Sequence, residues 1–161
     1  MSEIINDRRL DAWRLFLTLH AKIIEVIDAD VQGAGGIPLT HYDVLIELFE
    51  AEGKQLRMYE LAQRVALSRS SITRLVDQLA QQALLRRETD PKDRRGSYAI
   101  LTEAGETALR KSWPFYREAI LRHFGSLLAD EEAELLTQVF TRLHAAIEDK
   151  SLSNSHSMPK P

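Results

Sequence analysis

The chain has 161 residues, a net charge of −3 and no cysteine, and 44% of its residues are hydrophobic. This composition supports a hydrophobic core and excludes disulfides, thiolate metal sites and cysteine-based redox sensing. The net negative charge argues against an architectural nucleoid protein, because coating nucleic acid without sequence preference needs strong net positive charge.

The N-terminal part of the chain predicts two helices joined by a linker. Apolar residues recur at helical spacing over residues 8–31, and glycines and a proline within 32–38 end this helix. Thr40 is expected to cap a second helix that closes at Gly53. No apolar run reaches the roughly 18 residues of a membrane span, and the N-terminus lacks a secretory hydrophobic segment. We therefore expect a cytoplasmic protein with no membrane partner.

A helix-turn-helix is predicted next. A short helix covers about residues 57–65, a tight connection follows at residues 66–67, and Ser68 caps a helix that runs to about Gln82. The apolar face of this last helix has the spacing i, i+3, i+4 and i+7 and consists of Ile72, Leu75, Val76 and Leu79. Its remaining side chains are free to face a ligand.

The segments 84–89 and 97–102 have the composition of short strands, and the turn sequence DPKDRRG joins them. We interpret them as a β-hairpin with a charged tip, the wing of a winged helix. Residues 62–100 hold 8 basic and 4 acidic residues, whereas the segments on either side are acidic. A local basic face of this kind is typical of a nucleic-acid interface.

The C-terminal part predicts a long helix from Thr102, in which Pro114 should cause a kink or lie where a carbonyl is free. A last helix follows with Asp130 as its cap, and the Ser-rich tail 151–161 is expected to be disordered. The wide apolar faces of residues 8–31 and 103–148 require a partner, so we expect dimerisation helices there and a DNA-binding domain at 40–102. The predicted fold class is mainly α with a small β-hairpin, a winged helix-turn-helix in an intertwined homodimer.

Five sequence strings strongly resemble the MarR (multiple antibiotic resistance regulator) family, over about residues 10–148. They are LTHYDVL (39–45), MYELAQRV (58–65), SRSSITRLVDQL (68–79), DPKDRRG (90–96) and LTEAG (101–105). The resemblance implies a dimeric transcriptional regulator, more often a repressor, whose affinity for DNA changes when a small, in some cases aromatic, molecule binds. The chain departs from the family at Arg57, where a Thr-like cap usually precedes the short helix.

Six residues at the start of the second helix of the motif are expected to contact DNA. They are Ser68, Arg69, Ser70, Ser71, Thr73 and Arg74. Arginine can bond a guanine through two hydrogen bonds in the major groove, and Ser or Thr can bond base edges or phosphates. The alternative is that Arg69 and Arg74 are solvated surface charges and that Ser71 only caps or packs. Asp77 is expected to hold a neighbouring arginine, either Arg74 or one from the wing.

The wing string supplies three further expected contacts. The resemblance implies that Arg95 enters the minor groove, where a narrow A·T-rich segment attracts a guanidinium. Asp93 is expected to orient that side chain or close the turn, and Arg94 to contact a phosphate. The alternative is a charged hairpin tip that only keeps the protein in solution.

The resemblance also suggests an effector crevice between the dimerisation helices and the winged helix. Its candidate residues are Trp13, Arg14, His20, His41 and Tyr42, which offer aromatic surface and polar groups. The alternative is ordinary dimer core and helix capping. The five histidines show no close pair with metal-ligand spacing, so we expect no metal site and no cofactor.

Two other classes of function fit the sequence less well. A winged helix that binds protein instead of DNA predicts an uncharged recognition face, unlike the arginine-bearing face of this chain. An enzyme is not supported, because there is no phosphate-binding glycine loop, paired-carboxylate site or Ser–His–Asp arrangement. A symmetric dimer predicts a palindromic double-stranded operator with half-sites about 10 base pairs apart.

Overall fold

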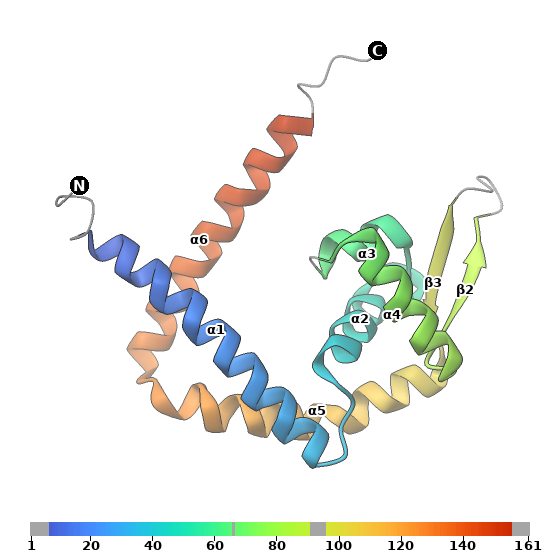
Figure 1. Cartoon of the computed structure of the whole chain (residues 1–161), viewed down its shortest axis with the longest axis horizontal. Coiled ribbons are helices and arrows are strands. Elements are labelled where there is room, and N and C mark those ends of the chain that lie inside the picture. The colour runs from blue at the N-terminus through green and yellow to red at the C-terminus, as the bar shows by residue number, and fades with distance from the viewer. Residues whose placement is uncertain (1–6, 66, 91–95, 156–161) are drawn as a thin grey trace. The chain divides into compact units, whose positions relative to one another are not determined.

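The computed structural model describes residues 7–65, 67–90 and 96–155, and the side chains of these residues up to 147 (Figure 1). The elements are α1 (Arg8–Gly33), α2 (Leu39–Glu50), the 3-10 turn η2 (Glu52–Lys54), β1 (Gln55–Arg57), α3 (Met58–Arg64), α4 (Arg69–Gln81), β2 (Leu85–Thr89), β3 (Ser97–Leu101), α5 (Glu103–His123), the 3-10 turn η3 (Gly125–Leu127) and α6 (Asp130–Ser155). The chain divides into two compact units, Met1–Ile120 and Leu121–Pro161, which are described separately. The mainly α winged helix-turn-helix fold is confirmed.

Within the described residues the sheet has three strands rather than the two expected. Its order is β1-β3-β2, and both pairs are antiparallel. Ala99 on β3 lies between Leu56 on β1 and Arg87 on β2. The strand β1 has three residues, too few for an alternating apolar pattern to be recognised in the sequence. The wing hairpin is therefore extended at its base by a strand that leads directly into α3.

The main core of the first unit joins α2, α3, α4 and the sheet. Its fully buried side chains include Val44, Leu45, Leu48, Leu61, Ile72, Val76, Leu79 and Leu85. The four apolar positions of α4 predicted from their spacing are all buried. A smaller cluster packs Ile27 and Val31 of α1 against Leu39 of α2 and Ala119 of α5. This second cluster connects the C-terminal half of α1 to the winged helix.

Two predicted helix caps were wrong by one or two residues. Helix α2 has Pro38 as its N-cap rather than Thr40, and the Asp28 carboxylate of α1 accepts a hydrogen bond from the Leu39 N–H at 2.8 Å. A side chain from another helix thus satisfies an amide at the start of α2, so the helix begins earlier than a local cap would allow. Asp130 is the first residue of α6, and the Ala129 N–H donates to Glu132 Oε2 at 2.9 Å.

Helix α5 starts where it was predicted, whereas α6 continues beyond its predicted end. Helix α5 continues through Pro114 as a single element, and Thr102 Oγ1 accepts from the Gly105 N–H at 3.0 Å at its start. Helix α6 reaches Ser155, so residues 151–155 of the expected disordered tail are helical. A polar sequence can continue an existing helix because each added residue gains a backbone hydrogen bond. Residues 156–161 lie outside the described residues.

Candidate nucleic-acid interface

The start of α4 presents a polar face opposite its buried stripe. Ser68 is the N-cap, and its Oγ accepts from the Ser71 N–H at 3.2 Å. Arg69, Ser70 and Arg74 are exposed. Because Ile72, Leu75, Val76 and Leu79 are buried on the other side, the core packing itself turns these polar residues outward.

The hydroxyl groups of this face make hydrogen bonds to one another and to the backbone. Ser68 Oγ lies 2.8 Å from Ser71 Oγ and 3.1 Å from Ser70 Oγ, and Thr73 Oγ1 donates to the Arg69 carbonyl at 2.8 Å. Ser71 therefore has the capping contact that the alternative reading expected. In contrast, the side chains of Arg69 and Arg74 make no ion pair with any residue that the structure describes. Their charges remain available to a ligand.

A hollow of about 320 Å³ lies between the start of α3, the start of α4 and the wing. It is lined by Arg57, Met58, Tyr59, Arg69, Ile72, Thr73, Arg87, Gly96 and Ser97. Three of these residues are arginines and none is acidic, so the hollow suits an anionic group such as a phosphate. Tyr59 and Arg87 were not predicted as site residues, although the basic pair of Arg86 and Arg87 in β2 is visible in the sequence.

The prediction for Asp77 is confirmed with a wing partner. Asp77 Oδ1 accepts from Arg87 Nη1 at 3.3 Å, and Arg87 Nε donates to Ser97 Oγ at 3.1 Å. The carboxylate thus links α4 to β2, and Ser97 links β2 to β3. Both partners of the Asp77–Arg87 ion pair are largely exposed, so its energetic value is small, but it orients the guanidinium beside the hollow.

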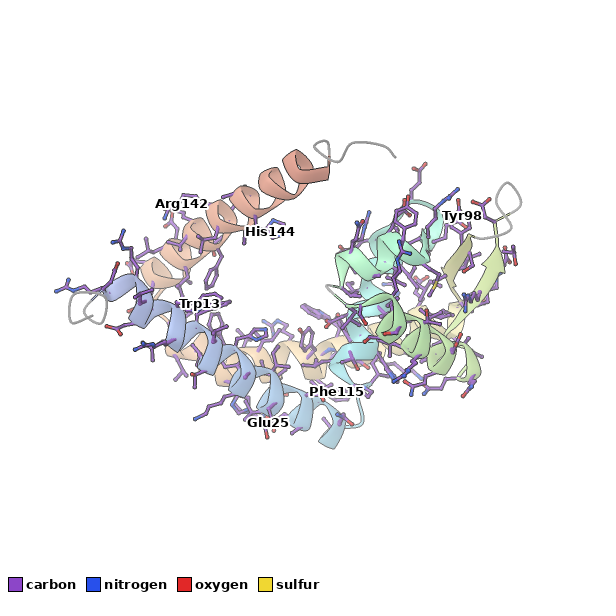
Figure 2. All side chains as sticks on the ribbon, turned by 45° about the horizontal axis from the view of Figure 1, so that its top comes forward. Trp13, Glu25, Tyr98, Phe115, Arg142 and His144 are labelled. Atoms are coloured by element: carbon purple, nitrogen blue, oxygen red, sulfur yellow. The ribbon has the colours of Figure 1, made fainter. Side chains whose placement is uncertain are left out.

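The base of the wing contains a buried charge cluster. The Asp90 side chain is 3% exposed and forms an ion pair with Arg57 Nη2. Arg57 Nε donates to the Tyr98 hydroxyl at 3.0 Å, and its guanidinium lies 5.3 Å from the centre of the Tyr98 ring. Tyr98 lies on β3 toward the wing end of the sheet (Figure 2). The Asp90 N–H donates to the Gly96 carbonyl at 2.9 Å, which closes the hairpin.

Arg57 also explains the departure at the start of α3. A guanidinium has no acceptor atom and cannot cap a helix N-terminus, but the Glu60 carboxylate accepts from the Arg57 N–H at 3.0 Å. The missing cap is thus partly replaced from inside the helix, and the Arg57 side chain is free to pair with Asp90. Three predicted wing residues, Asp93, Arg94 and Arg95, lie outside the described residues.

Known proteins resemble this chain over most of its length. A model of the MarR family matches residues 35–96. The HTH-type transcriptional regulator YkoM of Bacillus subtilis is 32% identical over 130 residues, which cover 81% of this chain and 82% of YkoM. The crystal structure of AbsC, a MarR family transcriptional regulator from Streptomyces coelicolor, has a TM-score of 0.77 and 30% identity, covering 89% of this chain and 97% of AbsC. The chain belongs to the MarR family.

A second solved MarR structure is similar to the same degree. Sco3205 from Streptomyces coelicolor, solved in complex with DNA, has a TM-score of 0.76 and 29% identity, covering 84% of each chain. The protein is therefore a MarR-family transcriptional regulator with the winged-helix fold of that family. Among the described residues of this regulator, no helix combines the length and the apolar character needed to cross a membrane.

The predicted effector residues of this MarR-family chain fall at different places in the first unit. Tyr42 is buried and lines a cavity of about 610 Å³ between α2 and α5. Trp13 and His20 lie on the N-terminal half of α1, where each ring is 6.0 Å from that of Phe16 (Trp13 is labelled in Figure 2). Trp13, Arg14 and His20 are exposed and do not line the cavity.

His41 lies in the first turn of α2, is half-buried and does not line the cavity either. Burial lowers the pKa of His41, and the negative charge of Asp28 opposes that shift. Burial also raises the pKa of the Tyr42 hydroxyl. No group of three His, Asp or Glu side chains in the described parts of the chain is arranged to hold a metal ion.

Proposed function

We propose that this MarR-family regulator binds a palindromic double-stranded operator as a homodimer and acts as a ligand-responsive repressor. The observation that carries the proposal is the exposed face of α4, where Arg69 and Arg74 form no ion pair with a described residue and Arg69 lines a hollow together with Arg57 and Arg87. The basic residues of this face coincide with the helix-turn-helix, and this placement suits DNA binding. Contacts to phosphates would give affinity, and contacts to bases would give specificity.

The proposed contact residues would bind different parts of the DNA, according to their side-chain chemistry. Arg69 and Arg74 would bond base edges in the major groove, and the residues Ser68, Ser70, Ser71 and Thr73 would bond bases or phosphates. The three wing residues Asp93, Arg94 and Arg95 would serve the minor groove and its adjacent phosphates. To the contacts suggested by the sequence we add Tyr59 and Arg87, which line the same basic hollow.

The dimer is proposed from apolar side chains that the single chain leaves exposed. On α1 they are Leu10, Trp13, Leu15, Phe16, Leu17 and Leu19, and on α6 they are Leu135, Phe140, Leu143 and Ile147. Helices with so many exposed large apolar side chains are typical of protein interfaces. We propose residues 8–31 and 103–148 as the dimerisation helices and residues 40–102 as the DNA-binding domain, so that two winged helices meet half-sites about 10 base pairs apart.

Ligand response is proposed for the cavity between α2 and α5. Its volume of about 610 Å³ is in the range of sites for small molecules, and four of its nine lining residues are aromatic. Tyr42 is the member of the predicted effector set that lines it. Trp13, Arg14 and His20 would join the cavity only across the proposed dimer, from the second copy of α1.

The test is fluorescence-anisotropy binding to the DNA upstream of the gene and to a scrambled duplex, across a salt series. Arg69→Ala, Arg74→Ala and Arg95→Ala are each expected to weaken binding by about 1 to 3 kcal/mol when they contact a base, or to lower the salt slope by about one when they contact a phosphate. Arg117→Ala, an exposed arginine on α5, is the matched control and should change neither quantity. Equal binding to both duplexes, indifferent to the three arginines, would instead favour a protein-binding winged helix.

A further inference from the structure

The residues that line the cavity between α2 and α5 indicate which kind of ligand it would bind. All its walls come from one compact unit of the chain. They are formed by Tyr42, Asp43, Ile46, Phe49, Glu50, Leu109, Arg110, Trp113 and Tyr116. Both the charge of these nine residues and the arrangement of their rings favour the same class of ligand.

Three aromatic rings of the cavity stand at steep angles to one another. The ring centres of Tyr42 and Tyr116 are 4.7 Å apart with an angle of 49° between their planes. Trp113 packs edge-on against Tyr116, with ring centres 6.2 Å apart and an angle of 70°. Trp113 is 48% exposed, so part of its ring surface is accessible to a ligand. Faces of aromatic rings carry negative potential and attract cations.

The unpaired charge on the walls is negative. Neither Asp43 nor Glu50 makes a hydrogen bond or an ion pair with a residue that the structure describes. The positive charge of Arg110 is already engaged, because Glu106 Oε1 accepts from its Nη2 at 2.8 Å and from its Nε at 3.2 Å. Its guanidinium also lies 5.2 Å from the centre of the Phe49 ring. Two carboxylates without an ion-pair partner among the described residues thus line the cavity, beside one arginine that shares Glu106 with Lys54.

The surroundings of Asp43 support this description. Although the residue is exposed as a whole, the protein packed around its carboxylate raises its pKa, and the negative charges of Glu47 and Asp28 add to the shift. A cationic ligand beside Asp43 would relieve this excess of negative charge, whereas an anion would increase it.

We propose that the cavity binds a lipophilic organic cation, such as an aromatic amine or a quaternary ammonium compound. The rings of Tyr42, Trp113 and Tyr116 contact the cationic group and its apolar substituents, and the carboxylates of Asp43 and Glu50 balance its charge. The inference rests on the proposed ligand response for its biological role, but it concerns the charge of the ligand and can be tested without DNA.

The test is isothermal titration of the full chain with three probes of similar size. They are benzyltrimethylammonium as the cation, N,N-dimethylbenzamide as the neutral compound and benzoate as the anion. The cation should bind about tenfold more tightly than the neutral probe, and benzoate more weakly than both. Asp43→Asn and Glu50→Gln should each weaken the cation several-fold and leave the neutral probe unchanged, which also shows that the variants are folded. Glu52→Gln, an exposed acid outside the cavity, is the matched control.

Three results would overturn the inference. They are benzoate binding as tightly as the cation, cation binding that is indifferent to both carboxylate variants, and no binding of any probe. The failure of this inference is distinct from the failure of the proposed function. Operator binding that depends on Arg69 and Arg74 would stand without cation binding, and carboxylate-dependent cation binding would stand in a chain that does not bind DNA.

Discussion

Removal of Arg57 should destabilise the protein more than removal of its partner Asp90. In Arg57→Met, the apolar part of the side chain is kept while the Asp90 carboxylate, 3% exposed, loses the guanidinium that pairs with it. In Asp90→Asn, the Arg57 guanidinium keeps its hydrogen bond to Tyr98 and, being 33% exposed, can reach water. The two variants break the same ion pair but leave very different charges behind.

The expected loss of stability differs between the two variants because the charges that remain differ in their exposure to water. Breaking a buried ion pair by removing one partner costs about 3 to 5 kcal/mol, because the remaining charge is stranded in a low dielectric. The partial exposure of Arg57 lets some water reach the site, so we expect about 2 to 3 kcal/mol for Arg57→Met and about 1 kcal/mol for Asp90→Asn. The larger loss corresponds to a fall in Tm of about 5 to 10 °C for a chain of this length.

The assay is urea unfolding of each variant at one fixed protein concentration, because dimerisation would make the stability depend on concentration. The double variant Arg57→Met/Asp90→Asn should recover part of the loss, since it no longer buries a carboxylate that has lost the Arg57 guanidinium. Arg64→Met is the matched control: its ion pair with Glu47 is 3.4 Å long and exposed, so it should cost at most about 1 kcal/mol. A loss for Asp90→Asn that equals or exceeds the loss for Arg57→Met would refute the reasoning.

Three further predictions concern the winged helix and α2. Gly105→Ala would place a Cβ 1.9 Å from the Leu84 carbonyl oxygen, so we expect a loss of about 3 kcal/mol or more in thermal unfolding; wild-type stability would mean that α5 starts differently. Ser68→Ala removes the cap of α4 and should cost about 1 kcal/mol, which Ser68→Thr should largely avoid. Because burial lowers the pKa of His41, the folded protein loses stability as the pH falls below about 6.5, where the unfolded chain binds the proton more readily. His41→Gln should flatten that part of the pH–stability curve, and an unchanged curve would contradict the assignment.

Local patterns in the sequence were sufficient for the helix-turn-helix and the wing. The spacing of Ile72, Leu75, Val76 and Leu79 determined which side of α4 is buried, and therefore which side presents Arg69. These features could be predicted because helix periodicity and N-caps act within one or two turns of the chain. The same is true of the turn between β2 and β3, whose composition identified the hairpin.

Contacts between distant segments were decided only by the tertiary structure. The start of α2 depends on Asp28 of another helix, and the strand β1 exists because β3 pairs with it. The partner of Arg57 is Asp90, 33 positions along the chain. No local spacing relates such residues, because their proximity results from how the helices and the sheet pack around a shared core.

The cavity between α2 and α5 shows most clearly the difference between what the sequence predicts and what only the tertiary structure decides. Tyr42 was identifiable as a candidate from its own segment, but Trp113 and Tyr116 belong to a helix that begins 61 positions later. By itself the sequence determined the fold family and which face of α4 is exposed. The packing of α5 against α2 decided which aromatic rings and which carboxylates share one site, because only folding brings side chains from separate helices within contact distance.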